Sequence, residues 1–283
     1  MKKILIAGII MAFIQFGFTD IVKAKPVIPL NNTNRKNATI KTNAKRAGHG
    51  ADSKKFFTLK VNNGDKLGNI FTRTISYKGD DFPEVVFRVG GTGVYTVIDN
   101  NPLNPVFDGV FRYDGWPESK GRDEIRDTGK TNIYIGKSSV NTDGSGVMFN
   151  ALIWGNPPAK LKKGDTWKVS IPQPWELGGV GTQIITVIDI DENNNSIRLQ
   201  REGSSGGFYD NDAKKISITK DGKAVTMTVT PGTSHWIGYT TFKNGLVISD
   251  ELLVSRPITL TADNLNFDAF EREYILLNAM PVS

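Results

Sequence analysis

Cysteine is absent from this chain of 283 residues. Its absence excludes disulfide bonds, thiol catalysis, thiolate metal sites and lipoprotein attachment, so the folded protein depends on packing alone. Histidine is scarce as well: His49 lies in a polar N-terminal stretch, which leaves His235 for any folded site. A metal centre built from several histidines is therefore excluded.

Long apolar runs are missing except at the N-terminus, where residues 4–18 follow Lys2 and Lys3. The run is shorter than the roughly 20 residues of a membrane-spanning helix. With the small residue Ala24 behind it, the pattern is typical of a secretory signal peptide over residues 1–24. We expect cleavage after Ala24, a periplasmic or extracellular protein and no transmembrane segment after cleavage. An uncleaved anchor is the alternative.

The formal charge of +6 is unevenly distributed. The leader carries a net +2 and residues 25–55 carry +7, so residues 56–283 carry −3. A mildly acidic main part does not favour nucleic acid as a partner. Residues 25–55 are polar and lack aromatic residues, which predicts a disordered basic linker. The linker is either a plain spacer or a tether to an anionic surface.

From Phe56 onward apolar and polar residues alternate with period two between Gly, Asn, Asp and Pro, which predicts an all-β protein. Residues 114–130 are polar and rich in glycine, so we expect a long surface loop there. The predicted strands are Phe56–Val61, Ile70–Tyr77, Glu84–Val89, Val94–Ile98, Val106–Tyr113, Asn132–Ile135, Val147–Trp154, Thr166–Ile171, Thr182–Ile190, Ser196–Arg201, Lys214–Lys220, Ala224–Thr230, His235–Phe242, Leu246–Val254 and Pro257–Thr261.

Two connections, Asp221-Gly222 and Asn244-Gly245, are typical of tight hairpin turns, which predicts an antiparallel meander over residues 159–283. A curling meander favours a barrel or half-barrel. The succession of short hairpins over residues 165–261, including Trp236-Ile237-Gly238-Tyr239, resembles that of secreted bacterial proteins with lipocalin-like or half-barrel sheets. Residues 56–158 form either a second, small β-sandwich-like domain or part of one domain spanning 56–283.

The last apolar segment, residues 270–277, fits both a helix and a strand. Phe270, Tyr274 and Leu277 share one helical face, yet the segment also suits a strand that covers the edge of the meander. We favour the strand because Pro281 follows it.

No catalytic motif is complete. Asp127-Thr128-Gly129 and Asp143-Gly144 resemble aspartic-protease turns, but they lie close together in polar sequence. No G-x-S-x-G motif occurs, so His235 is interpreted as a strand residue. The nearby carboxylates are Asp250-Glu251, Glu271 with Glu273, and Asp123-Glu124. Adjacent strand residues such as Asp250 and Glu251 point to opposite faces, so a working pair would have to come from different strands. We therefore expect no catalytic residue and no cofactor, with a carbohydrate-active hydrolase that uses paired carboxylates as an alternative.

One segment places oxygen-bearing side chains at alternate positions, as a calcium loop does: Asp189, Asp191 and Asn193. The glycine and glutamate that such a loop requires are absent from the corresponding positions. These residues are a weak calcium candidate, and a hairpin loop explains them without metal.

Aromatic residues are the last candidate constellation. Trp175 lies in a loop stiffened by prolines, where it would form either the rim of a binding mouth or a cap over the sheet. With Trp116 and Tyr239 it makes up the predicted ligand-binding set, whereas Trp236 is expected to fill the core. The sequence thus favours a non-catalytic envelope protein that binds a lipid-like hydrophobic ligand or a glycan. A structural or assembly partner of an envelope protein complex is the further alternative; ligand identity and oligomeric state stay open.

Overall fold

The computed structural model describes residues 50–101, 105–115, 118–125, 131–135, 138–142, 149, 151–171, 180–206 and 214–282. The predicted signal peptide and residues 25–49 of the predicted linker lie outside these ranges. The described chain is nearly all antiparallel strand, which confirms the predicted all-β class. It also contains two helices of four residues, α1 (Lys54–Phe57) and α2 (Ala151–Trp154).

Long strands dominate the described chain. A short pair, β1 (Ala51–Asp52) and β8 (Lys160–Leu161), forms a separate two-stranded sheet. The strands of the large sheet are β2 (Lys66–Gly79), β3 (Val85–Asp99), β4 (Val106–Tyr113), β5 (Ser119–Ile125), β6 (Thr131–Ile135), β7 (Ser138–Thr142), β9 (Thr166–Ile171), β10 (Gly181–Asp191), β11 (Ser196–Ser205), β12 (Lys214–Lys220), β13 (Lys223–Pro231), β14 (Ser234–Lys243), β15 (Leu246–Ala262) and β16 (Leu265–Met280).

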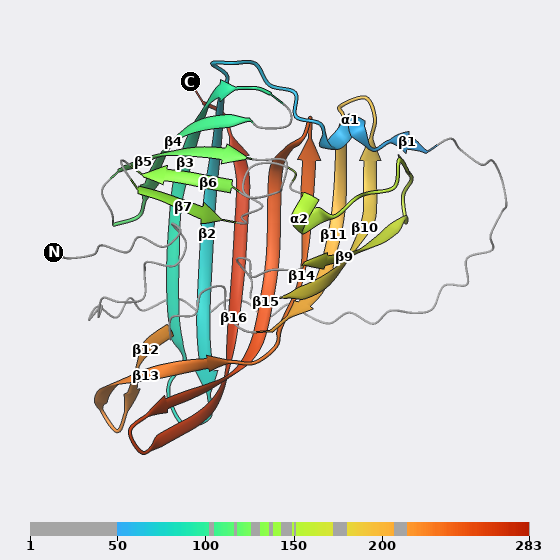
Figure 1. Cartoon of the computed structure of the whole chain (residues 1–283). Helices are drawn as coiled ribbons and strands as arrows, with labels where there is room; N and C mark the ends of the chain where they lie inside the picture. Colours follow the sequence, from blue (N-terminus) through green and yellow to red (C-terminus); the bar gives the residue numbers. More distant parts are fainter. Residues whose placement is uncertain are drawn as a thin grey trace, which may run out of the picture.

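These 14 strands of the described chain form one open sheet in the order β7-β6-β5-β4-β3-β2-β16-β15-β14-β11-β10-β9, with β13 and then β12 attached to β15. The end strands β7 and β9 do not pair with each other, so the described residues form no closed barrel. Figure 1 shows β4 to β7 running at a steep angle across β2 and β3, and the β12–β13 hairpin at the opposite end of the long strands.

The strands on the two sides of the predicted boundary at residue 158 share this sheet. β2 pairs with β16 from Gly79 opposite Ala269 to Gly68 opposite Met280. The first and the last strand of the large sheet therefore lie side by side near its middle (Figure 1). The division into two domains stays a prediction.

The inner face of the sheet is the face that α1, α2 and the β12–β13 hairpin cover. Phe56 of α1 and Trp154 of α2 are buried against strand residues such as Ile185 and Leu252. At the other end, Ile216 and Met227 of the hairpin pack with Leu260 of β15. The strict alternation of buried and exposed residues in β9 and β14 follows from one apolar face and one wet face, as predicted.

Several predicted local features are confirmed. Asp221, Gly222, Asn244 and Gly245 all have positive φ, as tight hairpin turns require. Residues 270–277 lie within β16, so the strand and not the helix is correct.

Three local predictions are wrong. Phe56–Val61 is not a strand, because Lys54–Phe57 form α1, which also means that structure begins inside the predicted linker 25–55. The predicted strand Val147–Trp154 ends in α2. The predicted loop 114–130 contains β5 (Ser119–Ile125). Its polar sequence gives no strand signal, and the strand forms because its backbone pairs with β4.

Candidate functional site

Only one residue of the predicted ligand-binding set can be located. Trp116 and Trp175 lie outside the described residues, as do His49, Asp127 and Asp143. Tyr239 lies on β14 and is partly exposed on the outer face, opposite to the face that carries buried Trp236. The expectation that Trp236 fills the core is confirmed, and His235 is a strand residue as predicted.

Polar partners flank Tyr239 on both neighbouring strands. Tyr239 stands directly opposite Gln200 of β11 and Glu251 of β15. The guanidinium carbon of Arg198 lies 4.9 Å from the centre of the Tyr239 ring, within the range of a cation–π contact. The ring is thus surrounded by an amide, a carboxylate and a cation on one sheet face.

A second tyrosine completes this arrangement. Tyr274 of β16 is 40% exposed, and its hydroxyl donates a 3.0 Å hydrogen bond to Oε1 of Glu251. Partial burial and this acceptor raise the pKa of Tyr274 above its ordinary value. Glu251 therefore stands beside both tyrosines. We name this set the outer platform: Arg198, Gln200, Tyr239, Glu251 and Tyr274.

Exposed apolar side chains border the outer platform. Ile237 stands opposite Leu253, and Leu253 stands opposite Tyr274, so the three lie in one row across β14, β15 and β16. Their exposed fractions are 40%, 48% and 40%. Because neighbouring strands are about 4.8 Å apart, the row extends roughly 10 Å across the sheet. The outer platform thus combines apolar and hydrogen-bonding surface.

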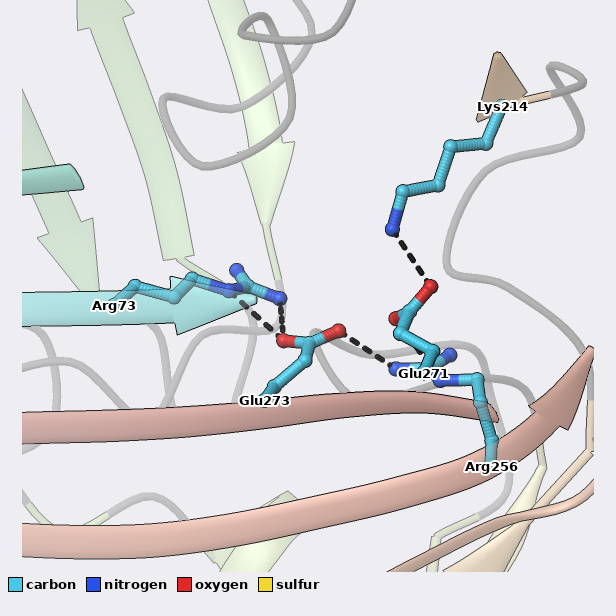
Figure 2. Close-up of polar contacts among 5 residues, drawn as sticks. All are labelled: Arg73, Lys214, Arg256, Glu271 and Glu273. Carbon is cyan, nitrogen blue, oxygen red and sulfur yellow. Dashed lines mark hydrogen bonds and ion pairs between the residues drawn. The ribbon is translucent and has the colours of Figure 1, made fainter. Parts of the chain in front are cut away.

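A second candidate site lies on the inner face, where five charged side chains meet (Figure 2). Arg256 Nη2 donates to Glu273 Oε1 at 2.9 Å, and its Nε lies 3.3 Å from Glu271 Oε1. Lys214 Nζ donates to Glu271 Oε2 at 3.0 Å, and Arg73 donates to Glu273 Oε2. Both carboxylates are buried. We name this set the inner charge cluster.

The two carboxyl groups of the inner charge cluster differ in their pKa shifts. Burial raises the pKa of Glu271 above its ordinary value, against the opposing effect of Lys214. Burial would also raise the pKa of Glu273, but the charges of Arg73 and Arg256 lower it well below the ordinary range. Burial and the Glu271 charge raise the pKa of neighbouring Tyr77.

The alternative of a hydrolase expected two carboxylates from different strands, whereas the two that the structure brings together lie on one strand. Two positions apart on β16, Glu271 and Glu273 point to the same face, and their pKa values move in opposite directions. Two neighbouring carboxyl groups whose pKa values are shifted in opposite directions are typical of acid–base pairs. Each carboxylate is, however, already held by cations in a buried site, which is equally typical of a structural ion-pair network.

A third polar group lies deeper in the core. Arg201 is completely buried, stacks over the Trp154 ring at 5.1 Å and donates from Nη2 to Asp250 Oδ2 at 2.6 Å. Thr240 donates to the other oxygen of Asp250, also at 2.6 Å. These residues connect β11, β14, β15 and α2, as expected of a structural polar network.

The weak calcium candidate lies at the β10–β11 turn. Asp191 Oδ1 accepts the backbone N–H groups of Asn193 and Asn194, each at 3.1 Å. The Asn194 side chain donates from Nδ2 to Asp191 Oδ2 at 2.6 Å. This side-chain bond, followed by the backbone bonds, lowers the pKa of Asp191. The oxygens of Asp191 thus stabilise the turn itself, and Asp189 lies in β10 opposite Arg198. Among the residues that the structure describes, no three His, Cys, Asp or Glu side chains are grouped as a metal site would need.

Sequence reasoning missed the buried cations, although a signal was present. In β11 the alternation of Ile197 and Leu199 continues to Arg201, which places its guanidinium inside. In β15 the same rule places Arg256 between Val254 and Ile258. A charged residue in register with buried apolar positions therefore indicates an internal ion pair.

Comparisons with known proteins give no relatives: no family model matches the chain, and its sequence matches no curated protein. Within the described ranges, no helix has the length and apolarity needed to span a bilayer.

Proposed function

We propose that the protein is a secreted or periplasmic, non-catalytic binding protein of the cell envelope, and that the outer platform binds a glycan. The observation that carries this proposal is the position of Glu251 beside Tyr239 and Tyr274 on a solvent-exposed sheet face. The leader sequence supports the compartment. N-terminal sequencing of the exported protein tests it, with a product that starts at Lys25 as the expected result.

A sugar ring has apolar C–H faces and polar hydroxyl edges, and the outer platform offers a partner for both. The tyrosine rings and Leu253 supply apolar surface, and partly exposed rings keep it available to a ligand. Arg198 and Gln200 supply donors, while Glu251 supplies acceptors. A flat strand surface suits an extended chain better than a compact small molecule.

The inner face of a half-barrel, lipocalin-like sheet is the other location for a hydrophobic ligand. In the described residues that face is occupied by two buried apolar clusters and by the inner charge cluster. We therefore favour the outer face and a glycan over a lipid held inside the sheet.

The proposal is tested by affinity electrophoresis of the protein through gels that contain soluble β-glucan, xylan or peptidoglycan fragments. We expect one of these to retard the protein, and Tyr239→Ala or Tyr274→Ala to weaken binding about tenfold, as loss of an aromatic hot spot does. Phe270→Ala is the matched control, because Phe270 is exposed on the same face of β16 away from the platform. Absence of retardation by every polysaccharide, or an equal loss in Phe270→Ala, contradicts the proposal.

A carbohydrate-active hydrolase is the second candidate, favoured by the opposite pKa shifts of Glu271 and Glu273. It predicts release of reducing sugar from the same polysaccharides and its loss in Glu271→Gln. A hydrolase inactivated by this change would replace the non-catalytic proposal. Co-purification of an envelope protein, lost in Ile237→Asp, would instead favour an assembly partner.

A further inference from the structure

A hollow on the outer face lies at the end of the sheet where β2, β3, β4 and β16 meet. It has a volume of about 380 Å³, within the range of small-ligand pockets. All of its lining residues belong to the described chain: Lys66, Thr92, Val94, Val110, Arg112, Met280, Pro281 and Val282. It is separate from the outer platform, since none of the platform residues lines it.

Gly68 explains why Met280 and Val282 can lie close against the sheet beside the hollow. It stands between Val94 of β3 and Met280 of β16, so one side chain is missing from this row. A Cβ atom at Gly68 would lie 2.5 Å from Val282 Cγ2 and 2.8 Å from Met280 Cγ. Met280 and Val282 therefore lie close to β2 because residue 68 is glycine, and they form one wall of the hollow.

The lining has an apolar body and a basic rim. Five residues supply apolar surface: Val94, Val110, Met280, Pro281 and Val282. Lys66 and Arg112 are exposed cations, and the Arg112 side chain is 69% exposed while its Nη2 lies 2.9 Å from Glu118 Oε2. An exposed pair of this kind is weak, so a ligand carboxylate can compete with Glu118 for the guanidinium fork.

We propose that this hollow, which we name the Gly68 groove, binds an amphipathic monocarboxylate such as a medium-chain fatty acid. The acyl chain lies along Val94, Val110 and Met280, where it loses contact with water. The carboxylate binds Arg112, with Lys66 as the second cation. A neutral ligand of the same length would leave the basic rim without a partner, and a small inorganic anion would leave the apolar walls in water.

Isothermal titration calorimetry of the protein with sodium decanoate, below its micelle concentration, tests the proposal. We expect saturable binding, about tenfold weaker in Arg112→Ala as a charge-assisted hydrogen bond is lost. Decanol and sodium acetate should both bind more weakly than decanoate. Glu118→Gln removes the competing carboxylate and should strengthen decanoate binding. Lys223→Ala, which removes an exposed cation at the start of β13, should leave it unchanged.

Val94→Asp places a like charge on the apolar wall and should abolish binding. Circular dichroism identifies any variant that fails to fold, and Glu118→Gln provides a test in which binding is gained. The proposal is overturned if decanoate does not bind or if decanol binds equally well. It is also overturned if neither Arg112→Ala nor Glu118→Gln changes the affinity for decanoate. The outer platform variants Tyr239→Ala and Tyr274→Ala should not affect decanoate, which keeps this outcome independent of glycan binding.

Discussion

Asp250 accepts a 2.6 Å hydrogen bond from the completely buried guanidinium of Arg201. The Nε and Nη1 atoms of Arg201 have no hydrogen-bond partner among the described residues. Asp250 is therefore the anion in the described structure that compensates this buried charge.

Replacing Asp250 with alanine should strongly destabilise the protein, because it leaves Arg201 buried without a counter-ion. We expect a loss of about 3–5 kcal/mol in the free energy of unfolding, measured by urea denaturation. Glu192→Ala removes an exposed ion pair with Lys55 and should change stability by less than about 1 kcal/mol. Equal effects of the two substitutions would contradict the assigned role of Asp250.

The inner charge cluster predicts an unusual dependence of stability on pH. The folded-state pKa of Glu273 is lowered, so its contribution is present above the unfolded pKa near 4.5 and is lost as the pH falls below it. The folded-state pKa of Glu271 is raised, so its contribution is full below that unfolded pKa and is lost as the pH rises through the folded value.

Glu271→Gln should remove the second effect and leave the first. Urea denaturation from pH 3 to pH 8 should then show a smaller loss of stability above pH 4.5 in the variant than in the natural protein. If both proteins lose stability equally over this range, the pKa of Glu271 in the folded protein is not raised.

Gly203 lies opposite Trp236, and the indole ring occupies the space of a side chain. A Cβ atom at Gly203 would lie 2.4 Å from Trp236 Cζ2. Gly203→Ala should therefore cost about 1–3 kcal/mol through overpacking. Gly206→Ala is the matched control, because a Cβ there meets no atom within 4 Å. Thermal unfolding of both variants checks the difference in their stabilities.

Two hairpin glycines with similar φ should respond differently to alanine. Gly222 and Gly245 have φ of 75° and 81°, so alanine is strained at both by about 1–2 kcal/mol. At Gly245 the added Cβ would also lie 2.5 Å from the backbone nitrogen of Leu59, whereas at Gly222 it meets nothing within 4 Å. Gly245→Ala should lower the melting temperature clearly more than Gly222→Ala. Equal shifts would mean that the contact with Leu59 relaxes freely.

The sequence supports the fold where the signal is local. Alternation in Thr166–Ile171 places Trp167 inside, and Asn244-Gly245 specifies the turn between β14 and β15 because both residues tolerate positive φ. α1 was not predictable, since Phe56-Phe57 in a polar context fits a strand end as well as one helical turn.

Strand order was beyond local reasoning. A meander places β12 beside β11, but β11 pairs with β14, and the β12–β13 hairpin attaches to the far half of β15. The residues of β2 do not predict that β16 is its neighbour. The candidate site followed the same pattern: Tyr239 was found from its residue type, whereas Tyr274 and Glu251 join it only through strand pairing.

The pairing of β2 with β16 affects the rate at which the chain folds. Arg73 and Glu273, which meet in that pairing region, are 200 residues apart in sequence. Such distant contacts make folding slow, since a long loop must close before they form. The middle of the sheet stays incomplete until β16 has been synthesised.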